Sequence, residues 1–341
     1  MSLRFCFLLL PLAAACSSVV HEDVASPPTV ERTARRLASF EDEATVAIAV
    51  DRENAYVTTR VSAGQGGSIV RIPLEGVGSS VVLASLEVAP FAIAIDDDWI
   101  YFTVRDRGTV HRIKKTGGAV ETVAEQPEHA NGAEAIALDA DHVYWTAVGG
   151  VFRAPKAGGA AERIAEDDLG ADALAVDSGE AFWIARGTTG DAEGALYKVA
   201  TSGGRKIALG TGPIFMPTWA FSIAVSGRFV FVPDPARGRV YRVDRTTGEI
   251  GLVAEQQAMP KALATDGSRV FWSTGGTAGA DTDVRTLSSA PIAGGPVEKI
   301  VETRQTNIFA IAVNERGAYF TDYVSTGSVY AASREASTQS H

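Results

Sequence analysis

The chain has 341 residues, a hydrophobic fraction of 46%, 34 glycines and a formal net charge of −10. The apolar content is enough for a large core, and the glycines indicate many tight turns, because glycine adopts positive φ at little cost. The acidic balance argues against nucleic acid as a partner, since phosphate binding requires a basic patch. The simplest role of the excess acid is solubility.

Residues 1–16 have the pattern of a secretion signal. Arg4 gives a positive start, and the apolar run from Phe5 to Ala15 is too short to span a bilayer as a stop-transfer helix. The run ends in Leu12-Ala13-Ala14-Ala15-Cys16, which resembles the lipobox of bacterial lipoproteins, where the cysteine is acylated and becomes the new N-terminus. The leucine stands four residues before Cys16 instead of three, so an ordinary signal-peptidase site after Ala15 is the alternative.

Cysteine usage favours lipidation at Cys16. The other cysteine, Cys6, lies within the signal, so a mature chain keeps one cysteine and forms no internal disulfide. We therefore expect secretion across the inner membrane and a lipoprotein of the periplasm, outer membrane or cell surface. Residues 17–32 are polar and contain Pro27 and Pro28, and we expect a flexible tether there.

The remainder of the chain is a repeat. The block Ala92-Ile93-Ala94-Ile95-Asp96 returns in six further copies, 38 to 49 residues apart, a period that fits a four-stranded propeller blade. The last residues of the seven blocks are Asp51, Asp96, Asp139, Asp177, Ser226, Asp266 and Asn314. An aromatic residue follows each of them after five positions: Tyr56, Tyr101, Tyr144, Phe182, Phe231, Phe271 and Tyr319. The residues between are predicted to form a tight hairpin turn, in which the aspartate accepts hydrogen bonds from backbone amides.

Each repeat continues with two more predicted strands. A third strand follows a glycine, as in Gly150-Val151-Phe152-Arg153, and a fourth follows a glycine turn, as in Glu162-Arg163-Ile164-Ala165. Sheets this small bury both faces only by packing against their neighbours in a ring. The predicted fold is therefore all-β, a seven-bladed β-propeller with four antiparallel strands in each blade.

The seventh copy lacks a fourth strand, and the N-terminus supplies a candidate. Residues 33–39 stand shortly before the first block. The predicted fourth strand Glu162-Arg163-Ile164-Ala165 stands in the corresponding place before the fourth block. We expect this segment to complete blade 7, because such closure covers a sheet edge. The propeller is then residues 33–333, followed by a polar tail, 334–341, and is expected to be a monomer.

Three repeats carry a known motif. Tyr144-Trp145-Thr146-Ala147, Phe271-Trp272-Ser273-Thr274 and Tyr319-Phe320-Thr321-Asp322 resemble the YWTD repeat of lipoprotein-receptor ectodomains. The block that precedes them resembles NHL-type, gluconolactonase-type and streptogramin-lyase-type propellers. YWTD propellers have six blades, whereas this chain has seven copies. Only Asp322 keeps the motif's aspartate, which the resemblance implies to be structural.

The mouth of the central channel is the expected ligand site. The residue before each block lies there: Val46, Phe91, Glu134, Asp172, Phe221, Lys261 and Phe309. The valine and phenylalanines predict a largely apolar mouth, and Glu134, Asp172 and Lys261 are candidates for the polar group of a pocket. The alternative is that Lys261 only neutralises one of the acids across the channel.

Two classes of function follow. The leading hypothesis is a cell-envelope binding or scaffold lipoprotein that recognises a protein, peptide or glycan on its loop face. The alternative is a propeller hydrolase or lyase acting on a small lactone-like substrate, with His129 and Glu134 as candidate catalytic residues. We expect no cofactor. Calcium is an alternative at the acidic loops 190–193 and 279–283, which also fit solvated loops.

Overall fold

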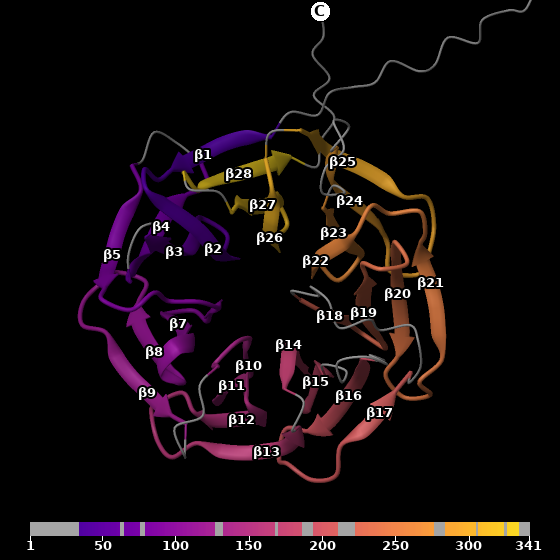
Figure 1. Cartoon of the computed structure of the whole chain (residues 1–341), viewed down its shortest axis with the longest axis horizontal. Helices are drawn as coiled ribbons and strands as arrows, with labels where there is room; N and C mark the ends of the chain where they lie inside the picture. Colours follow the sequence, from indigo (N-terminus) through magenta and orange to yellow (C-terminus); the bar gives the residue numbers. More distant parts are fainter. Residues whose placement is uncertain are drawn as a thin grey trace, which may run out of the picture. The chain divides into compact units, whose positions relative to one another are not determined.

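The fold is a seven-bladed β-propeller, as predicted. The computed structural model describes residues 34–61, 65–75, 79–126, 132–167, 170–185, 194–210, 222–275, 284–304, 306–323 and 326–333. Within these ranges, strands β1 to β28 form seven four-stranded antiparallel sheets arranged as a ring (Figure 1). The ring belongs to one unit, Arg32–His341. No helix of the described ranges is long and apolar enough to cross a membrane.

Each blade runs from an innermost first strand to an outer fourth strand. Blade 1 consists of β2 (Glu43–Val50), β3 (Asn54–Val61), β4 (Gly67–Pro73) and β5 (Val81–Leu86). Blade 2 consists of β6 (Ile93–Ile95), β7 (Trp99–Val104), β8 (Thr109–Lys114) and β9 (Glu121–Glu125). Blade 3 consists of β10 (Ile136–Leu138), β11 (His142–Ala147), β12 (Gly149–Pro155) and β13 (Glu162–Asp167). Blade 4 consists of β14 (Ala171–Asp177), β15 (Glu180–Ala185), β16 (Ala195–Ala200) and β17 (Ile207–Leu209). Blade 5 consists of β18 (Ala224–Ser226), β19 (Phe229–Asp234), β20 (Arg239–Asp244) and β21 (Ile250–Ala254). Blade 6 consists of β22 (Pro260–Thr265), β23 (Arg269–Thr274), β24 (Arg285–Pro291) and β25 (Glu298–Thr303). Blade 7 consists of β26 (Ile308–Val313), β27 (Gly317–Asp322), β28 (Ser328–Ser333) and β1 (Arg35–Ser39), and the 3-10 helix η1 (Arg105–Arg107) follows β7.

The N-terminal strand closes the ring. Strand β1 pairs antiparallel with β28, with Arg35 opposite Ala331 and Ser39 opposite Ser328. A register shift occurs at Leu37, whose side chain packs against a cluster that joins blades 1 and 7. This confirms that the N-terminal strand is the fourth strand of blade 7.

The five-residue spacing in each repeat has a direct structural cause. Asp139 Oδ1 accepts hydrogen bonds from the amides of Asp141 (2.9 Å) and His142 (2.7 Å), as expected for the hairpin turn. Its other oxygen accepts a hydrogen bond from the Tyr144 hydroxyl at 2.6 Å. The same arrangement occurs in blades 1 and 2. The aspartates of the repeat therefore fix the turn and the neighbouring strand together.

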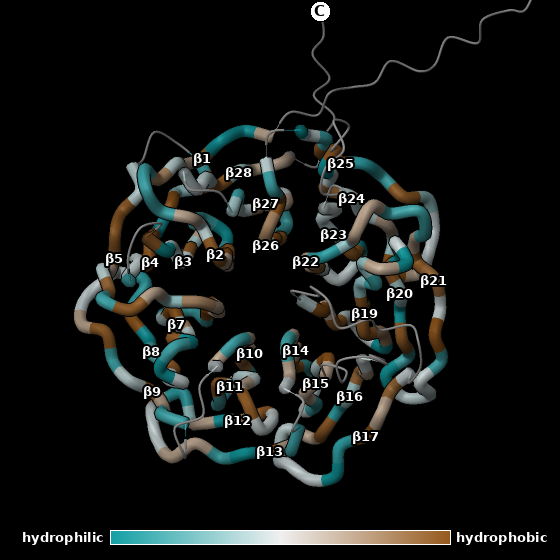
Figure 2. Tube along the Cα trace, in the orientation of Figure 1, coloured by the Kyte–Doolittle hydropathy of each residue, from teal (hydrophilic) through white to brown (hydrophobic). Residues whose placement is uncertain are grey.

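Each innermost strand has one face of small residues and one face of larger residues, and the small face of one blade packs against the larger face of the next. Ala135 and Ala137 of blade 3 pack against Leu174 and Val176 of blade 4. The equivalent residues at the seam of blades 7 and 1 are Ala310 and Ala312 against Ile48 and Val50. Alternation of side chains along a strand puts the alanines on one face and the larger residues on the other. Figure 2 shows hydrophobic residues on innermost strands such as β2 and β26.

The threonine of the YWTD-like motif also links two blades. The Thr146 hydroxyl accepts a hydrogen bond from the Ala135 amide (3.0 Å) and donates one to the Asp172 carbonyl of the next blade (3.2 Å). Thr58, in blade 1, bonds to Ala47 and Phe91 in the same way. A hydroxyl is needed here because the amide is at least partly buried and would otherwise lack a partner.

We predict that Tyr144→Phe makes the ring less sensitive to alkali. Burial, together with the hydrogen bond to Asp139, raises the pKa of Tyr144 to about 12. The folded state therefore keeps a proton that the unfolded state releases above about pH 10. The free energy of unfolding must then fall as the pH rises from about 10 to about 12.

Thermal unfolding between pH 8 and pH 12 measures this effect. Tyr144→Phe should be less stable by about 1 kcal/mol at pH 8, where one hydrogen bond is lost. Its melting temperature should then fall less steeply than that of the wild type as the pH is raised. Equal slopes for the two proteins would contradict the prediction.

Candidate functional site

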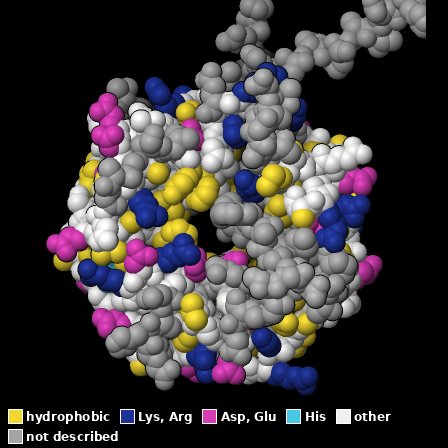
Figure 3. All heavy atoms as spheres, viewed as in Figure 1, with side chains coloured by type: hydrophobic (Ala, Val, Ile, Leu, Met, Phe, Trp, Pro, Cys, Tyr) yellow, Lys and Arg dark blue, Asp and Glu magenta, His cyan; other side chains and the backbone are white. Residues whose placement is uncertain are grey.

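The candidate site is the face where each first strand begins and each second strand ends. We call the residues at these two positions around the central opening the mouth. Figure 3, which looks along the axis of the ring, shows hydrophobic, acidic and basic side chains around this opening. The antiparallel pairing of the first two strands places both positions at the same end of every blade.

A charged and aromatic group bridges blades 2 and 3 at the mouth. Arg105, in η1, contacts Glu134 with 2.8 Å between Nη2 and Oε1. Its guanidinium also lies over the Phe91 ring, 5.4 Å from the ring centroid. The Glu134 side chain is 17% exposed, and Arg105 is 49% exposed. The guanidinium therefore keeps donors available to a ligand while it holds Glu134 and Phe91 in place.

Two stacked aromatic residues occupy the mouth of blade 7. The Phe309 and Tyr323 rings lie 4.6 Å apart with an interplanar angle of 26°. Tyr323 is 38% exposed. Beside this pair, the buried Asp322 accepts a hydrogen bond from the Asn307 amide at 2.8 Å, and burial raises the pKa of Asp322. Asp322 thus orders the loop that carries the stack, which fits the structural role implied by the resemblance to YWTD repeats.

Asp172 and Lys261 stand at the mouth of blades 4 and 6. The Asp172 carbonyl accepts the Thr146 hydroxyl, and Lys261 lies close against Gly275, where a Cβ would come within 2.6 Å of its Nζ. Both residues make further interactions, as do Glu134 and Phe309. Glu134 is paired with Arg105, and the convergence of Glu134, Asp172 and Lys261 on one polar group stays a prediction.

Several expected site residues lie outside the described residues. These are His129, Phe221, Cys16 and the two acidic loops considered for calcium. Within the described part of the chain, no group of three or more His, Cys, Asp or Glu residues could hold a metal ion. Val46, the last of the seven residues predicted to line the mouth, is buried.

Sequence reasoning missed Arg105 and Tyr323. Each directly follows the second strand of its blade, nine residues after the last residue of the repeat block. The same offset gives Arg60, Val148, Pro235 and Gly275 in other blades. The spacing of the repeat locates these positions in every blade. Because the residue type differs from blade to blade, a search for recurring residues does not find them.

The comparisons with known proteins support the fold. The chain matches no family model and no curated protein sequence. A chain of a nidogen/laminin complex is 17% identical with a TM-score of 0.55, covering 73% of this chain and 95% of that chain. The computationally designed protein Ika8 is 14% identical with a TM-score of 0.58, covering 87% and 99%. The extracellular domain of BT4673 from B. thetaiotaomicron, a one-component system candidate, is 12% identical with a TM-score of 0.58, covering 89% and 40%. At these identities the likeness shows a β-propeller and nothing finer.

Proposed function

We propose that this β-propeller is a cell-envelope binding or scaffold lipoprotein of the YWTD or NHL-like type, anchored through Cys16. It recognises a protein, peptide or glycan at the mouth. The observation that carries the proposal is the pair of aromatic groups there, one beside an exposed guanidinium and one stacked on an exposed tyrosine. Aromatic and arginine side chains are the residues that most often dominate binding energy at interfaces.

The arrangement of Glu134 supports binding over catalysis. Its carboxylate is in direct contact with Arg105 and is largely buried. A general base must instead reach a proton of the substrate within hydrogen-bond distance. Two proteins that share the fold are a chain of a nidogen/laminin complex and an extracellular domain of BT4673. Both are compatible with a binding propeller outside the cytoplasm.

The test is capture from envelope extracts with the soluble body, residues 33–341, followed by affinity measurement with the captured partner. Arg105→Ala, and separately Phe309→Ala combined with Tyr323→Ala, should each weaken binding at least tenfold, about 1.4 kcal/mol. Arg52→Ala is the matched control, because Arg52 lies in the hairpin turn at the opposite end of blade 1 and its side chain is 77% exposed. Equal binding by all variants would contradict recognition at the mouth. Turnover of a lactone that collapses in Glu134→Gln would favour the enzyme instead.

A further inference from the structure

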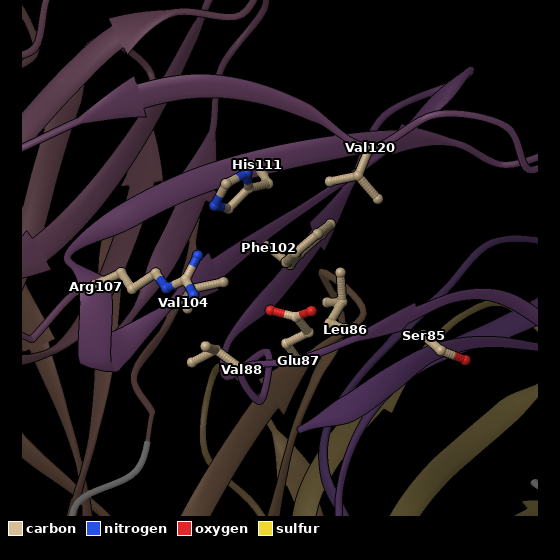
Figure 4. A pocket seen from close by; sticks show the side chains of 9 residues that line it. All are labelled: Ser85, Leu86, Glu87, Val88, Phe102, Val104, Arg107, His111 and Val120. Atoms are coloured by element: carbon tan, nitrogen blue, oxygen red, sulfur yellow. The ribbon is translucent and has the colours of Figure 1, made fainter. Parts of the chain in front are cut away.

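A pocket lies at the seam between blades 1 and 2, on the outer part of the ring (Figure 4). Its volume is ≈ 280 Å³. Leu86 and Val88 contribute to it from the end of blade 1 and the loop after it, and Phe102, Val104 and Val120 contribute from blade 2. Glu87 and Arg107 place their charged groups on the same side of the pocket in this view.

An aromatic pair of blade 2 lines the pocket. Second and third strands carry stacked pairs of aromatic rings, Trp145 with Phe152 in blade 3 and Trp183 with Tyr197 in blade 4. The equivalent pair in blade 2 is Phe102 with His111. Phe102 and His111 both line the pocket and are smaller than the pairs of blades 3 and 4. The equivalent positions of blade 1 carry the still smaller pair Val57 and Val70.

His111 is held as a neutral wall of this pocket. Its Nε2 lies 2.8 Å from the Thr109 hydroxyl, and its Nδ1 lies 3.3 Å from the Thr122 hydroxyl. Burial, and to a smaller extent the nearby Arg107, lowers the pKa of His111. An uncharged imidazole stacked on Phe102 presents a largely apolar surface to whatever enters.

The edge strand beside the pocket lacks the usual protection. In the described part of the chain, β5 pairs with β4 on one side and with no strand on the other. The outer strands β1, β9, β13 and β25 each contain at least two charged residues, whereas β5 is Val-Val-Leu-Ala-Ser-Leu. It is the longest of the three uncharged outer strands, and Val82 is 57% exposed. Exposed edges without charge are templates for pairing with another chain.

We propose that β5 and the pocket form a second binding site, for an extended, uncharged segment of a partner protein. The segment adds to blade 1 as a fifth strand and inserts one large apolar side chain between blades 1 and 2. Main-chain hydrogen bonds to β5 give affinity, and the pocket selects the side chain, because alternate residues of an added strand face the same side. A volume of ≈ 280 Å³ leaves room for one large apolar side chain.

The charge of the molecule favours a different protein as the occupant. Each copy of this chain carries a net charge of −10, which opposes the approach of a second copy. An uncharged segment meets no such repulsion and matches the uncharged edge.

The probe is a peptide of alternating threonine and valine with a central phenylalanine, flanked by glycine and serine for solubility and labelled with an uncharged fluorophore. Fluorescence anisotropy with residues 33–341 should show saturable binding. A peptide with serine at the centre should bind at least tenfold more weakly. Val82→Lys should weaken the phenylalanine peptide at least tenfold, while Ile207→Lys, at a 52% exposed position of the uncharged edge β17, should not.

The pocket itself is tested by a double variant, Phe102→Trp with His111→Tyr, which copies the pair of blade 4. It should melt no lower than the wild type and should bind the phenylalanine and serine peptides equally. Equal binding of the two peptides by the wild type, or absence of binding, would overturn the proposal. So would a dimer of the wild type that Val82→Lys dissociates, because a second copy would then occupy the edge.

Discussion

Deleting residues 33–39 is expected to lower the melting temperature of the whole ring by on the order of 10 °C, since the loss of several kcal/mol shifts a protein of this size by that much. The deletion removes β1, so that β28 loses its antiparallel partner. It also removes the hydrogen bond, 2.8 Å long, from Arg35 to the Leu74 carbonyl of blade 1. Blade 7 would then expose unpaired amides and carbonyls at its edge, and association between chains should increase.

The point substitution Leu37→Asp tests the packing part of this effect. Leu37 is partly buried against residues of blades 1 and 7, including Ile72 and Val329. Replacing it with aspartate removes apolar contacts and places a charge at the seam, which should cost about 2 kcal/mol. Calorimetry of a soluble protein that begins at residue 17 compares both variants with a third that lacks residues 17–30. The third should melt like the wild type, and equal melting of all three would show that β1 does not hold the ring closed.

Cys16→Ser is expected to release the protein from membranes completely. The expectation follows from the small residues before Cys16 and from the position of Cys6 inside the signal. Acyl chains attached at Cys16 would supply the membrane affinity, because each buried CH₂ contributes about 0.8 kcal/mol. Without the thiol there is no site for the first acylation.

Metabolic labelling with a fatty acid, followed by membrane fractionation, measures the result. The wild type should be labelled and sediment with membranes, whereas Cys16→Ser should be unlabelled and soluble. Cys6→Ser is the control, since that residue leaves with the signal and its change should have no effect. Membrane association of unlabelled Cys16→Ser would mean that another contact holds the protein there.

The architecture of the ring could be predicted because each blade repeats the same local chemistry. The offset between Asp139 and Tyr144 is set by a tight hairpin turn, so it recurs in all seven copies, and in blades 1 to 3 a hydrogen bond from the tyrosine to the aspartate reinforces it. The closure was predictable because the seventh copy lacks a fourth strand and residues 33–39 resemble the outer strand of blade 3. Such features depend on contacts between residues that are near in sequence or equivalent in the repeat.

The site was less predictable, because it is made of residues that differ between blades. Glu134 and Phe91 were found from their place before the block, but Arg105, which joins them, lies in η1, and η1 is the one 3-10 helix among the residues that the structure describes. The pocket between blades 1 and 2 is lined by side chains of both blades, such as Leu86 from blade 1 and Phe102 and His111 from blade 2. Such a pocket becomes visible only when the neighbouring blade is in place.

The two unlike faces of each blade give the ring a direction. At the seams between blades 3 and 4, 6 and 7, and 7 and 1, the alanine face of one blade meets the aliphatic face of the next, so these seams are head-to-tail contacts of the same kind. A chain cut short before blade 7 would present Ala262 and Ala264 at one end and Ile48 and Val50 at the other. These two surfaces are complementary, but in an incomplete ring they cannot meet within one chain. Head-to-tail contacts between chains that do not close into a ring generate open polymers. Premature termination of this chain therefore carries a risk of filaments, beyond the simple loss of a blade.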